Sequence, residues 1–569
     1  MPQRSSLRRR TLLKGMAATS LLPLLGANLV GCSDGSDNVA SGAPGEFLHG
    51  VASGDPLTDG VILWTRLTPA ADGLVRVAWE VSESADFTTI VASGQGTTSA
   101  EVDYTVKVDV TGLAADRSYY YRFTSGDNTS PLGRTRTLPL GAVTLASFAV
   151  VSCSNYPEGY FNVYREVAQE DVAAVLHLGD YIYESGNASK GAELGRVVEP
   201  PREIISLADY RMRYAQYRAD TDLQAAHAAH PFITVWDDHE ISNDTWRNGA
   251  DNHDPATDGD FATRKREAIQ AWYEWQPVRP PSSVTGIIYR RFQYGDLLDL
   301  FMLDTRIIGR DQQLEYANFS TGGQIDLAAA RAAIAAPERN LLGEEQRAWL
   351  REQLSQSAAR WQVLGQQVLL SRFQLPAAVV EALEPGASED DALAAATAAV
   401  LAAVAAKNKA PEERSAEEQA LLDSAIPFNL DQWDGYEYER DQLLRYAVDV
   451  GSRLVVLTGD SHNAWSSQLT TPEGAIAGIE FGCTSVTSDG FENQLGDDAA
   501  DLFGPLAASL IDDLKRANLK NRGYLYVEFS ADEVRASHRF VTTVQSREYA
   551  LDESIGIEHR VARADMLLS

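Results

Sequence analysis

Cysteine and basic side chains are scarce in this sequence of 569 residues. Of its 3 cysteines, only Cys153 and Cys483 lie beyond the N-terminal region, so the chain is not held by a disulfide framework. The two thiols either pair with each other or serve separate roles. Lys and Arg number 49 against 80 Asp and Glu, a formal net charge of −31. Binding a polyanion by counterion release requires the opposite balance, which argues against nucleic acid as a standing partner.

No hydrophobic run long enough to span a membrane occurs beyond the N-terminus. The apolar run Met16 to Val30 is short for a span and follows the arginines at positions 8–10. The motif Arg-Arg-x-Leu-Leu-Lys resembles the twin-arginine export signal, whose route carries folded proteins. We therefore expect residues 1–31 to be a signal peptide read by the twin-arginine translocation machinery, and a periplasmic or extracellular protein.

A second targeting feature follows directly. Leu29-Val30-Gly31-Cys32 resembles a bacterial lipobox, in which Cys32 is acylated and anchors the protein as a lipoprotein; the alternative is ordinary cleavage nearby. Ser33 to Gly45 is rich in Ser, Gly, Asp and Asn. This composition predicts a flexible tether over residues 32–46.

The first folded unit shows the alternation of β-strands with one buried face. Val75, Val77, Trp79 and Val81 alternate with more polar residues, and the same pattern recurs from Val106 to Val110. A Thr-Gly-Leu turn then leads into Tyr119-Tyr120-Tyr121-Arg122-Phe123, which resembles the corner of a fibronectin III or immunoglobulin-like β-sandwich. We predict this sandwich over residues 47–138, with structural support as its role and ligand binding as the alternative.

From residue 139 onward, buried strands alternate with helical stretches. Six apolar runs each end directly in polar or reactive residues. Run 148–151 is followed by Ser152-Cys153-Ser154-Asn155, run 172–178 by Gly179-Asp180-Tyr181-Ile182-Tyr183-Glu184, and run 232–236 by Asp237-Asp238-His239-Glu240. Run 297–303 is followed by Asp304-Thr305-Arg306, run 363–365 by Gln366-Gln367, and run 454–458 by Gly459-Asp460-Ser461-His462. The carboxyl edge of an open α/β sheet is where ligands bind, so we expect these segments to converge on one crevice.

The converging side chains are potential metal ligands. They comprise a thiol, a phenol, carboxylates and imidazoles: Cys153, Tyr183, Asp180, Asp237, Asp238, Asp460, His239 and His462. Thiolate, phenolate and imidazole favour a transition metal, whereas clustered carboxylates favour hard cations such as calcium. A single Asp after a strand is usually a turn or helix cap. Taken together, however, these residues predict a mixed site with unlike ions.

The motifs resemble those of the PhoD-like alkaline phosphatases and phosphodiesterases. The likeness begins at His49-Gly50-Val51-Ala52-Ser53-Gly54-Asp55-Pro56 and Leu63-Trp64-Thr65-Arg66, and continues through the segments around Cys153, Asp180, Asp237 and Asp460. It implies an α/β fold, with the sandwich followed by a four-layer αββα metallophosphoesterase-type catalytic domain at 139–569. It also implies hydrolysis of phosphate esters outside the cytoplasm with iron and calcium, as one Fe³⁺ and one or two Ca²⁺.

The same resemblance assigns roles to the iron side of the site. Asp180 is similar to the carboxylate that bridges two metals, and Tyr183 to a phenolate ligand of ferric iron. Cys153 would complete the iron side, and His462 resembles the imidazole that closes its ligand shell. Asp460, two residues earlier, would bind the neighbouring ion.

Two further aspartates are assigned to the harder cation. Asp238 stands where relatives of this arrangement place an Asn ligand, and its additional charge suits calcium better than zinc. Asp237 either serves a further calcium or orients a neighbouring ligand.

The expected reaction is in-line attack on phosphorus by a metal-activated hydroxide. His239 would protonate the leaving oxygen or hydrogen-bond the phosphate, and Asn155 would contact the phosphate. Arg306 either pairs with Asp304 as scaffold or reaches the phosphate. The substrates are phosphate monoesters or diesters, with wall or lipid phosphodiesters as the narrower alternative. In a different class, the chain would be a surface lipoprotein that binds cations or an extracellular partner without catalysis.

Two Ala-rich segments have strong helix propensity, Leu327 to Ala336 and Ala392 to Ala406. We expect peripheral helices there, either packed on the surface or forming a cap over the site. The segments Tyr524 to Phe529 and Val534 to Val544 predict a C-terminal hairpin that closes the sheet.

Overall fold

The computed structural model describes residues 44–186, 189–280, 286–383 and 389–568. The expected signal peptide, Cys32 and all but the last three residues of the expected tether lie outside the described residues. Within the described ranges, no helix is both long and apolar enough to cross a membrane.

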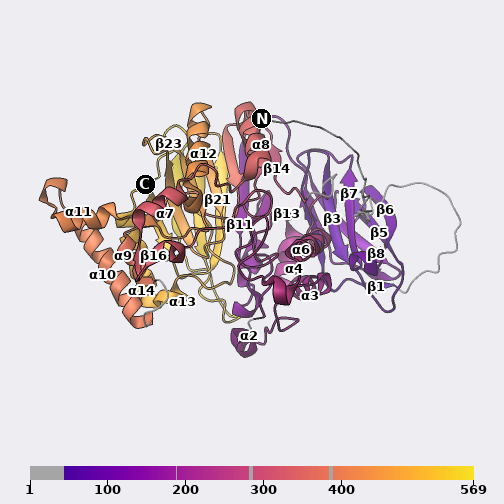
Figure 1. The fold of residues 1–569 in the computed structure, drawn as a ribbon. Coiled ribbons are helices and arrows are strands. Elements are labelled where there is room, and N and C mark those ends of the chain that lie inside the picture. Colours follow the sequence, from indigo (N-terminus) through magenta and orange to yellow (C-terminus); the bar gives the residue numbers. More distant parts are fainter. Residues whose placement is uncertain (1–43, 187–188, 281–285, 384–388, 569) are drawn as a thin grey trace, which may run out of the picture.

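The N-terminal part of the described chain is a β-sandwich (Figure 1). One sheet contains β5 (Val75–Ser82), β6 (Ile90–Thr98), β8 (Ser118–Ser125) and β10 (Gly133–Arg136), with the short β9 (Asn128–Thr129) beside β8. The facing strands are β2 (Val51–Gly54), β3 (Gly60–Arg66) and β7 (Thr105–Thr111). Inward residues of both sheets form one apolar cluster that includes Val61, Leu63, Val77, Val108, Tyr121 and Phe123. The sandwich predicted from period-two patterning is confirmed.

One sheet of this sandwich continues into the part of the chain that follows residue 139. β2 pairs in parallel with β13 (Pro231–Thr234), with Ser53 opposite Pro231 and Gly54 opposite Phe232. Close approach requires glycine at position 54, because a Cβ there would lie 2.5 Å from the Phe232 carbonyl oxygen. The two parts therefore share a sheet of nine strands, in the order β27-β26-β25-β11-β12-β13-β2-β3-β7.

The part that follows residue 139 contains two sheets. The first adds β11 (Leu145–Val151), β12 (Ala174–His177), β25 (Gly523–Ser530), β26 (Glu533–Phe540) and β27 (Ile557–Ala562). The second has seven strands in the order β14 (Arg290–Tyr294), β15 (Leu298–Met302), β18 (Trp361–Gly365), β21 (Leu454–Thr458), β23 (Ile476–Gly482), β22 (Ala464–Thr470) and β24 (Leu514–Asn518). All six apolar runs expected to be strands are strands, and the predicted C-terminal hairpin is β25 with β26.

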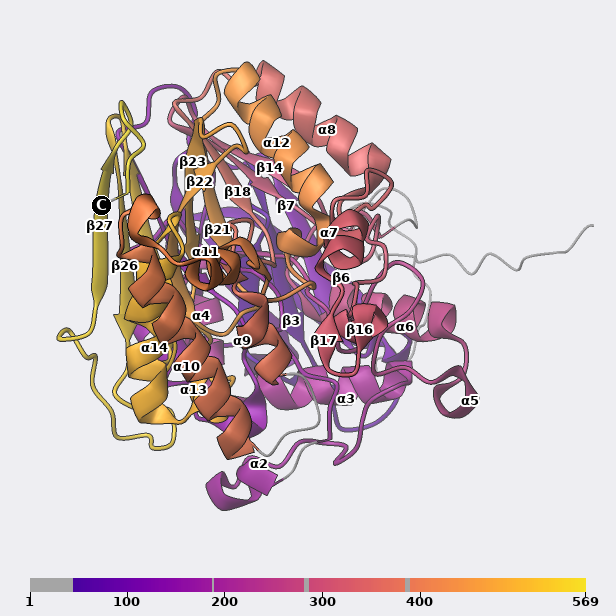
Figure 2. The ribbon, with the colours of Figure 1, turned by 60° about the vertical axis from the view of Figure 1, so that its left-hand side comes forward.

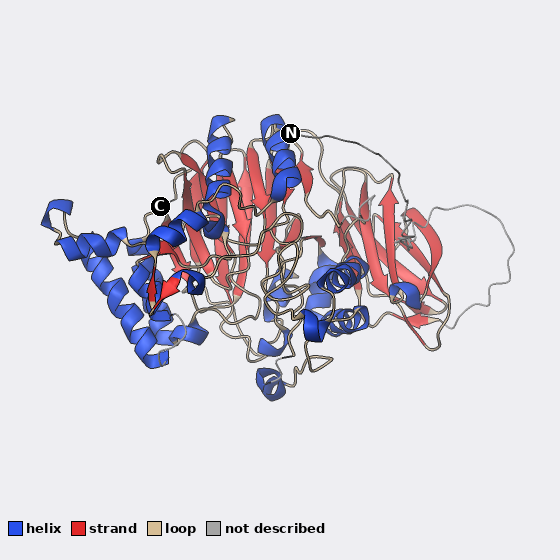
Figure 3. Cartoon of the chain, in the orientation of Figure 1, coloured by secondary structure: helices blue, strands red, loops and turns tan. Residues whose placement is uncertain are grey.

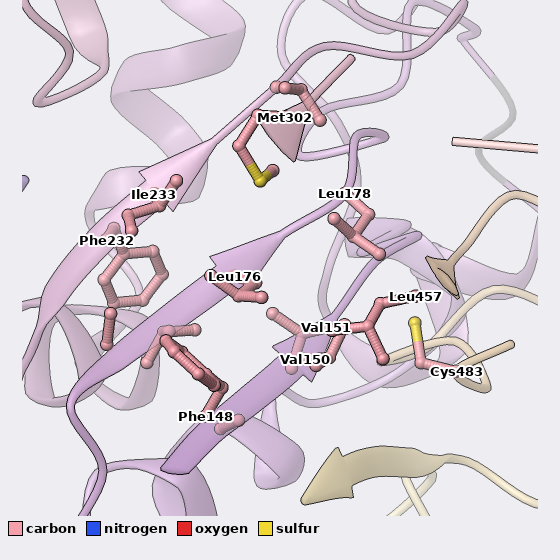
Figure 4. Close-up of a cluster of buried hydrophobic side chains, with 14 of the residues drawn as sticks. Phe148, Val150, Val151, Leu176, Leu178, Phe232, Ile233, Met302, Leu457 and Cys483 are labelled. Atoms are coloured by element: carbon pink, nitrogen blue, oxygen red, sulfur yellow. The ribbon is translucent and has the colours of Figure 1, made fainter. Parts of the chain in front are cut away.

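The two sheets pack against each other through a large apolar core. Phe148 and Leu176 of the first sheet share this core with Met302 and Leu457 of the second (Figure 4). The first sheet is covered by α1 (Asn162–Val167), α3 (Leu207–Arg218), α4 (Thr221–Ala229) and α6 (Phe261–Trp275), and the second by α8 (Gly343–Gln356) and α12 (Glu437–Asp449). The layers run α, β, β, α, as expected (Figure 3).

Helix boundaries follow local capping chemistry. Ser206 and Asp209 form a reciprocal capping box at the start of α3, and the Asp220 side chain accepts backbone hydrogen bonds at the start of α4. Shorter helices include α2 (Ser189–Leu194), α5 (Pro255–Asp258), α7 (Leu327–Ile334) and α13 (Glu492–Leu495).

Both Ala-rich segments are helical, as predicted, in α7 and α10 (Glu389–Lys407). α10 packs with α9 (Ala377–Leu383), α11 (Ala416–Asp423) and α14 (Asp497–Leu510) at the end of the molecule opposite the sandwich (Figures 1 and 2). An apolar cluster of these helices includes Val400, Ala500 and Ala507 and reaches Trp465 of β22.

Candidate metal centre

The loops at the carboxyl ends of the strands hold unusual backbone conformations. Cys153, Asp180, Asp460 and His462 all have left-handed backbones, with φ of 60°, 54°, 59° and 60°. An L-residue with a side chain pays a steric cost in this region, so the surrounding structure must impose it. Such conformations gather at functional sites, and sequence patterning gave no sign of them.

Two of these loops approach each other at Gly179. Its φ is 103°, and a Cβ there would lie 2.3 Å from the Cβ of Asp237. Glu240 fixes the same contact, because its carboxylate accepts the backbone N–H groups of Asp180 (2.9 Å), Tyr181 (2.7 Å) and Asp237 (2.7 Å). Burial raises the pKa of Glu240 to about 7. The sequence signalled Glu240 only as the last residue of a motif.

The structure brings Cys153, Asp180 and His462 together, with their ligand atoms within 4.8 Å of one another. The Tyr183 hydroxyl donates to Asp180 Oδ2 at 2.9 Å and lies 3.1 Å from His462 Nε2. On its other side His462 places Nδ1 2.5 Å from the Asp489 carbonyl oxygen, which fixes Nδ1 as the donor and leaves Nε2 as the ligand atom.

Without a cation, the thiol and the phenol of this cluster are protonated and the imidazole is neutral. Burial, reinforced by the charge of Asp180, raises the pKa of the Cys153 thiol and the Tyr183 phenol well above their ordinary values. Burial also lowers the pKa of His462 to about 3, so its imidazole is neutral and able to coordinate. A metal bound by these groups would have to displace the thiol and phenol protons.

Two more groups of potential ligands adjoin the first. Asp180, Asp238 and His239 form one, and Asp237, Asp238 and Asp460 form the other. Asp180 Oδ1, Asp237 Oδ2 and Asp238 Oδ1 are buried without a hydrogen-bond partner among the described residues. Buried carboxylate oxygens are normally satisfied. Of the three, Asp238 Oδ1 lies 3.8 Å from Arg306 Nη2, too far for a hydrogen bond. These orphaned oxygens, which have no hydrogen-bond donor within the described ranges, fit one or more hard cations.

Arg306 supplies the positive charge that balances carboxylates of the site, a role that the sequence left open. Its guanidinium is fully buried and reaches Asp237 Oδ1 (2.5 Å), Asp460 Oδ1 (2.7 Å) and both oxygens of Asp431 (2.9 and 2.7 Å). The Asp304 side chain instead accepts the backbone N–H of Arg306, at 2.9 Å. Asp431 was not foreseen, because no apolar strand precedes it in the sequence.

His239 is held by a carboxylate that also went unforeseen as a site residue. Its Nδ1 lies 2.6 Å from Glu184 Oε2, and its ring centroid lies 4.1 Å from that of Tyr183. Burial opposes protonation, but the charges of Glu184, Asp238 and Asp180 hold the pKa of His239 well above its ordinary value. With Nδ1 engaged, Nε2 is the nitrogen available to a ligand.

A cavity of about 470 Å³ opens onto these residues. Its lining includes Asp180, Asp238, His239, Asp244, Asp431, Asp460 and His462. Cys153 lies behind this surface at 0% exposure. Asn155, expected to touch phosphate, is 8% exposed, is not part of this lining, and has a buried Oδ1 without a partner among the described residues.

Comparisons with known proteins identify the family of the chain. The family model for PhoD-like phosphatase matches residues 148–538, and the model for the PhoD-like phosphatase N-terminal domain matches residues 33–139. The chain is 36% identical over 463 residues to alkaline phosphatase D of Bacillus subtilis (strain 168), covering 78% of this chain and 70% of that protein.

A solved structure described as PhoD superposes with a TM-score of 0.73 at 32% identity, covering 93% of this chain and 92% of the other. The match thus spans the sandwich, both sheets and the loops that carry the candidate ligands. The chain belongs to the PhoD-like phosphatase family, as an enzyme homologous to alkaline phosphatase D.

Proposed function

We propose that this enzyme is an exported alkaline phosphatase that hydrolyses phosphate monoesters and diesters with two kinds of cation. The observation that carries the proposal is the grouping of a thiol, a phenol, a carboxylate and an imidazole beside three orphaned carboxylate oxygens. A site for calcium alone has no use for a thiol or a phenol, which favours catalysis over the cation-binding lipoprotein alternative.

The donor types divide the site between ions. Cys153, Tyr183 and His462 suit Fe³⁺, and Asp180, which belongs to two of the ligand groups, would bridge to the second ion. Asp237, Asp238 and Asp460 offer oxygen ligands only and suit one or two Ca²⁺. Asp237 already accepts from Arg306 through Oδ1, so only its Oδ2 remains for a cation.

Bound cations would lower the pKa of a water molecule and neutralise charge on the phosphate oxygens. The chain itself would position these groups: Arg306 holds Asp237 and Asp460 in place, and Glu184 fixes the ring of His239. From Nε2, a protonated His239 can donate to the leaving oxygen. Asn155 would contact the phosphate only if its loop shifts when substrate binds.

Export by the twin-arginine route to the periplasm or the exterior is part of the proposal. It rests on the arginine motif ahead of Met16, and a lipid anchor rests on the lipobox at Cys32.

The proposal is tested with bis-p-nitrophenyl phosphate and p-nitrophenyl phosphate at alkaline pH. We expect turnover of both, a loss of at least about tenfold on calcium chelation, and recovery when calcium is restored. Metal analysis of the same samples should show iron retained and calcium lost. Absence of turnover by folded, metal-loaded protein would favour the cation-binding lipoprotein instead.

His239→Ala should slow esters with poor leaving groups more than esters with good ones. An alkyl phosphate needs its leaving oxygen protonated, so we expect a loss of about 10²–10⁴-fold, against a much smaller loss for p-nitrophenyl phosphate. Steady-state kinetics on both substrates measures the difference. His253→Ala, in a surface loop, is the matched control. Equal losses on both esters would contradict the acid role and leave a phosphate-binding one.

A further inference from the structure

One part of the cavity lining is apolar and takes no part in the chemistry proposed above. It consists of four aromatic rings and one leucine, here called the aromatic wall: Phe373, Phe428, Trp465, Phe491 and Leu369. Neighbouring rings lie 5.0 to 6.2 Å apart between centroids and meet edge to face. The rings therefore form one continuous surface beside the candidate metal ligands.

Two rings of the aromatic wall, Trp465 and Phe491, are tied to the loop that carries Asp460 and His462. Trp465 Nε1 donates to Ser461 Oγ at 2.7 Å, and Ser461 lies between Asp460 and His462 in the sequence. The backbone N–H of Phe491 donates to Asn463 Oδ1 at 3.3 Å. These bonds hold the rings in a fixed position relative to the site, as a preformed binding surface requires.

The two outer rings are the ones that a ligand can reach. Trp465 and Phe373 are 2% and 6% exposed, whereas Phe428 and Phe491 are half-buried. Phe428 is anchored by its backbone N–H, which donates to the Phe373 carbonyl oxygen at 2.9 Å. Apolar surface left open beside a charged centre is unfavourable unless something covers it, and in an enzyme cavity the substrate is the natural cover.

We propose that the aromatic wall is a leaving-group subsite for a planar, uncharged aromatic ring, either an aryl group or a nucleobase. This inference rests on the proposed function and names the class of ester that the site prefers. Aromatic side chains stack on planar rings, and each stacked base strengthens binding by about 5- to 150-fold. A neutral ring is also not repelled by the acidic lining. The amide side chains of Asn429, Gln432 and Gln494 line the same cavity and can hydrogen-bond the heteroatoms of a base.

Substrate pairs that differ only in the ring test the inference. For the nucleobase, adenosine 5′-monophosphate is compared with methyl ribofuranoside 5-phosphate, which has the same leaving hydroxyl but no base. For the aryl group, benzyl phosphate is compared with cyclohexylmethyl phosphate and ethyl phosphate. We expect kcat/KM to favour at least one ring-bearing ester by about tenfold or more. The pair that shows the preference identifies the source of the ring.

Variants of the outer rings link the preference to the wall. In the double variant Phe428→Leu with Phe491→Leu, which keeps apolar volume but removes both rings, we expect the preference to fall at least about fivefold. The change should appear mainly in KM, because stacking is made in the ground state as well as the transition state. Phe503→Leu is the matched control, since Phe503 packs in the same apolar cluster without lining the cavity; its preference should be unchanged.

Three results would overturn the inference. The first is equal kcat/KM for ring-bearing and ring-free esters. The second is equal kcat/KM for benzyl and cyclohexylmethyl phosphate, together with no preference for the ester that carries a nucleobase. The third is a preference that the double variant does not diminish. In each case p-nitrophenyl phosphate is still turned over, so the proposed function stands. If no ester is turned over at all, the proposed function fails and the subsite fails with it.

Discussion

Asp180→Asn will lower kcat/KM for bis-p-nitrophenyl phosphate by about 10³-fold or more and will reduce the content of both metals. Asp180 belongs to two of the three potential ligand groups and also accepts the Tyr183 hydroxyl, so its loss weakens both ion sites at once. Kinetics and elemental analysis of the same preparation measure the two effects. Asp532→Asn, at a side chain that is 96% exposed, should change neither. Full metal content in the Asp180 variant would contradict the bridging role.

The same substitution should have the opposite effect on the stability of the metal-free protein. Burial, with the charges of Asp238 and Asp237, raises the pKa of Asp180 well above its ordinary value of 3.8. When folding raises the pKa of a carboxyl, the protein loses stability as pH rises above the pKa of that carboxyl in the unfolded chain. The reason is that the unfolded chain then releases the proton while the folded protein still holds it. At pH 8 after chelation, we expect the variant to melt above the unsubstituted protein, by about 1 °C for each kcal/mol of stability gained in a chain of this length. The difference should vanish near pH 4.

Arg306→Leu will lower the free energy of unfolding of the metal-free protein by about 3–5 kcal/mol. The guanidinium is fully buried and pairs with Asp237, Asp431 and Asp460, so its removal leaves buried carboxylates without a counter-charge. Urea unfolding monitored by tryptophan fluorescence measures the loss. Calcium should reduce it, because the cation replaces part of the missing charge.

An exposed arginine provides the control for this substitution. Arg560 is 58% exposed and pairs with Glu558 on the surface, so Arg560→Leu should cost no more than about 1 kcal/mol. If the Arg306 and Arg560 variants were equally stable, Arg306 would not be the scaffold of the carboxylate cluster. A calcium-independent deficit would place its role away from the calcium ligands.

Much of the site could be predicted because local sequence patterns indicate its residues. Cys153, Asp180, Asp238 and Asp460 each follow a buried apolar run. The first three follow neighbouring parallel strands of one sheet, whose carboxyl ends meet at one edge, whereas Asp460 follows β21 of the second sheet and reaches them only because the two sheets pack together. Glu184 and Glu240 each end a motif that follows a predicted strand. The sequence did not indicate that Glu184 would hold an imidazole or that Glu240 would accept three backbone amides.

Residues in irregular segments could not be found in this way. Asp431 lies 125 positions from Arg306 and follows no apolar strand. Phe428 and Phe491 look like ordinary core residues until their loops bring them to the cavity. The shared sheet could not be foreseen either, since the sequence predicts a sandwich over residues 47–138 but not that its β2 pairs with β13.

The sequence by itself determined the sandwich, the succession of buried strands and the kinds of donor atom that follow them, because period, burial and residue chemistry are local properties. Only the tertiary structure decided which donors share an ion, which carboxylate oxygens are left without partners, and which charge Arg306 balances. It also decided that aromatic rings face the same cavity as the ligands. These outcomes depend on side chains far apart in sequence meeting within a few ångströms, and that proximity is set by how the two sheets pack and not by any segment alone.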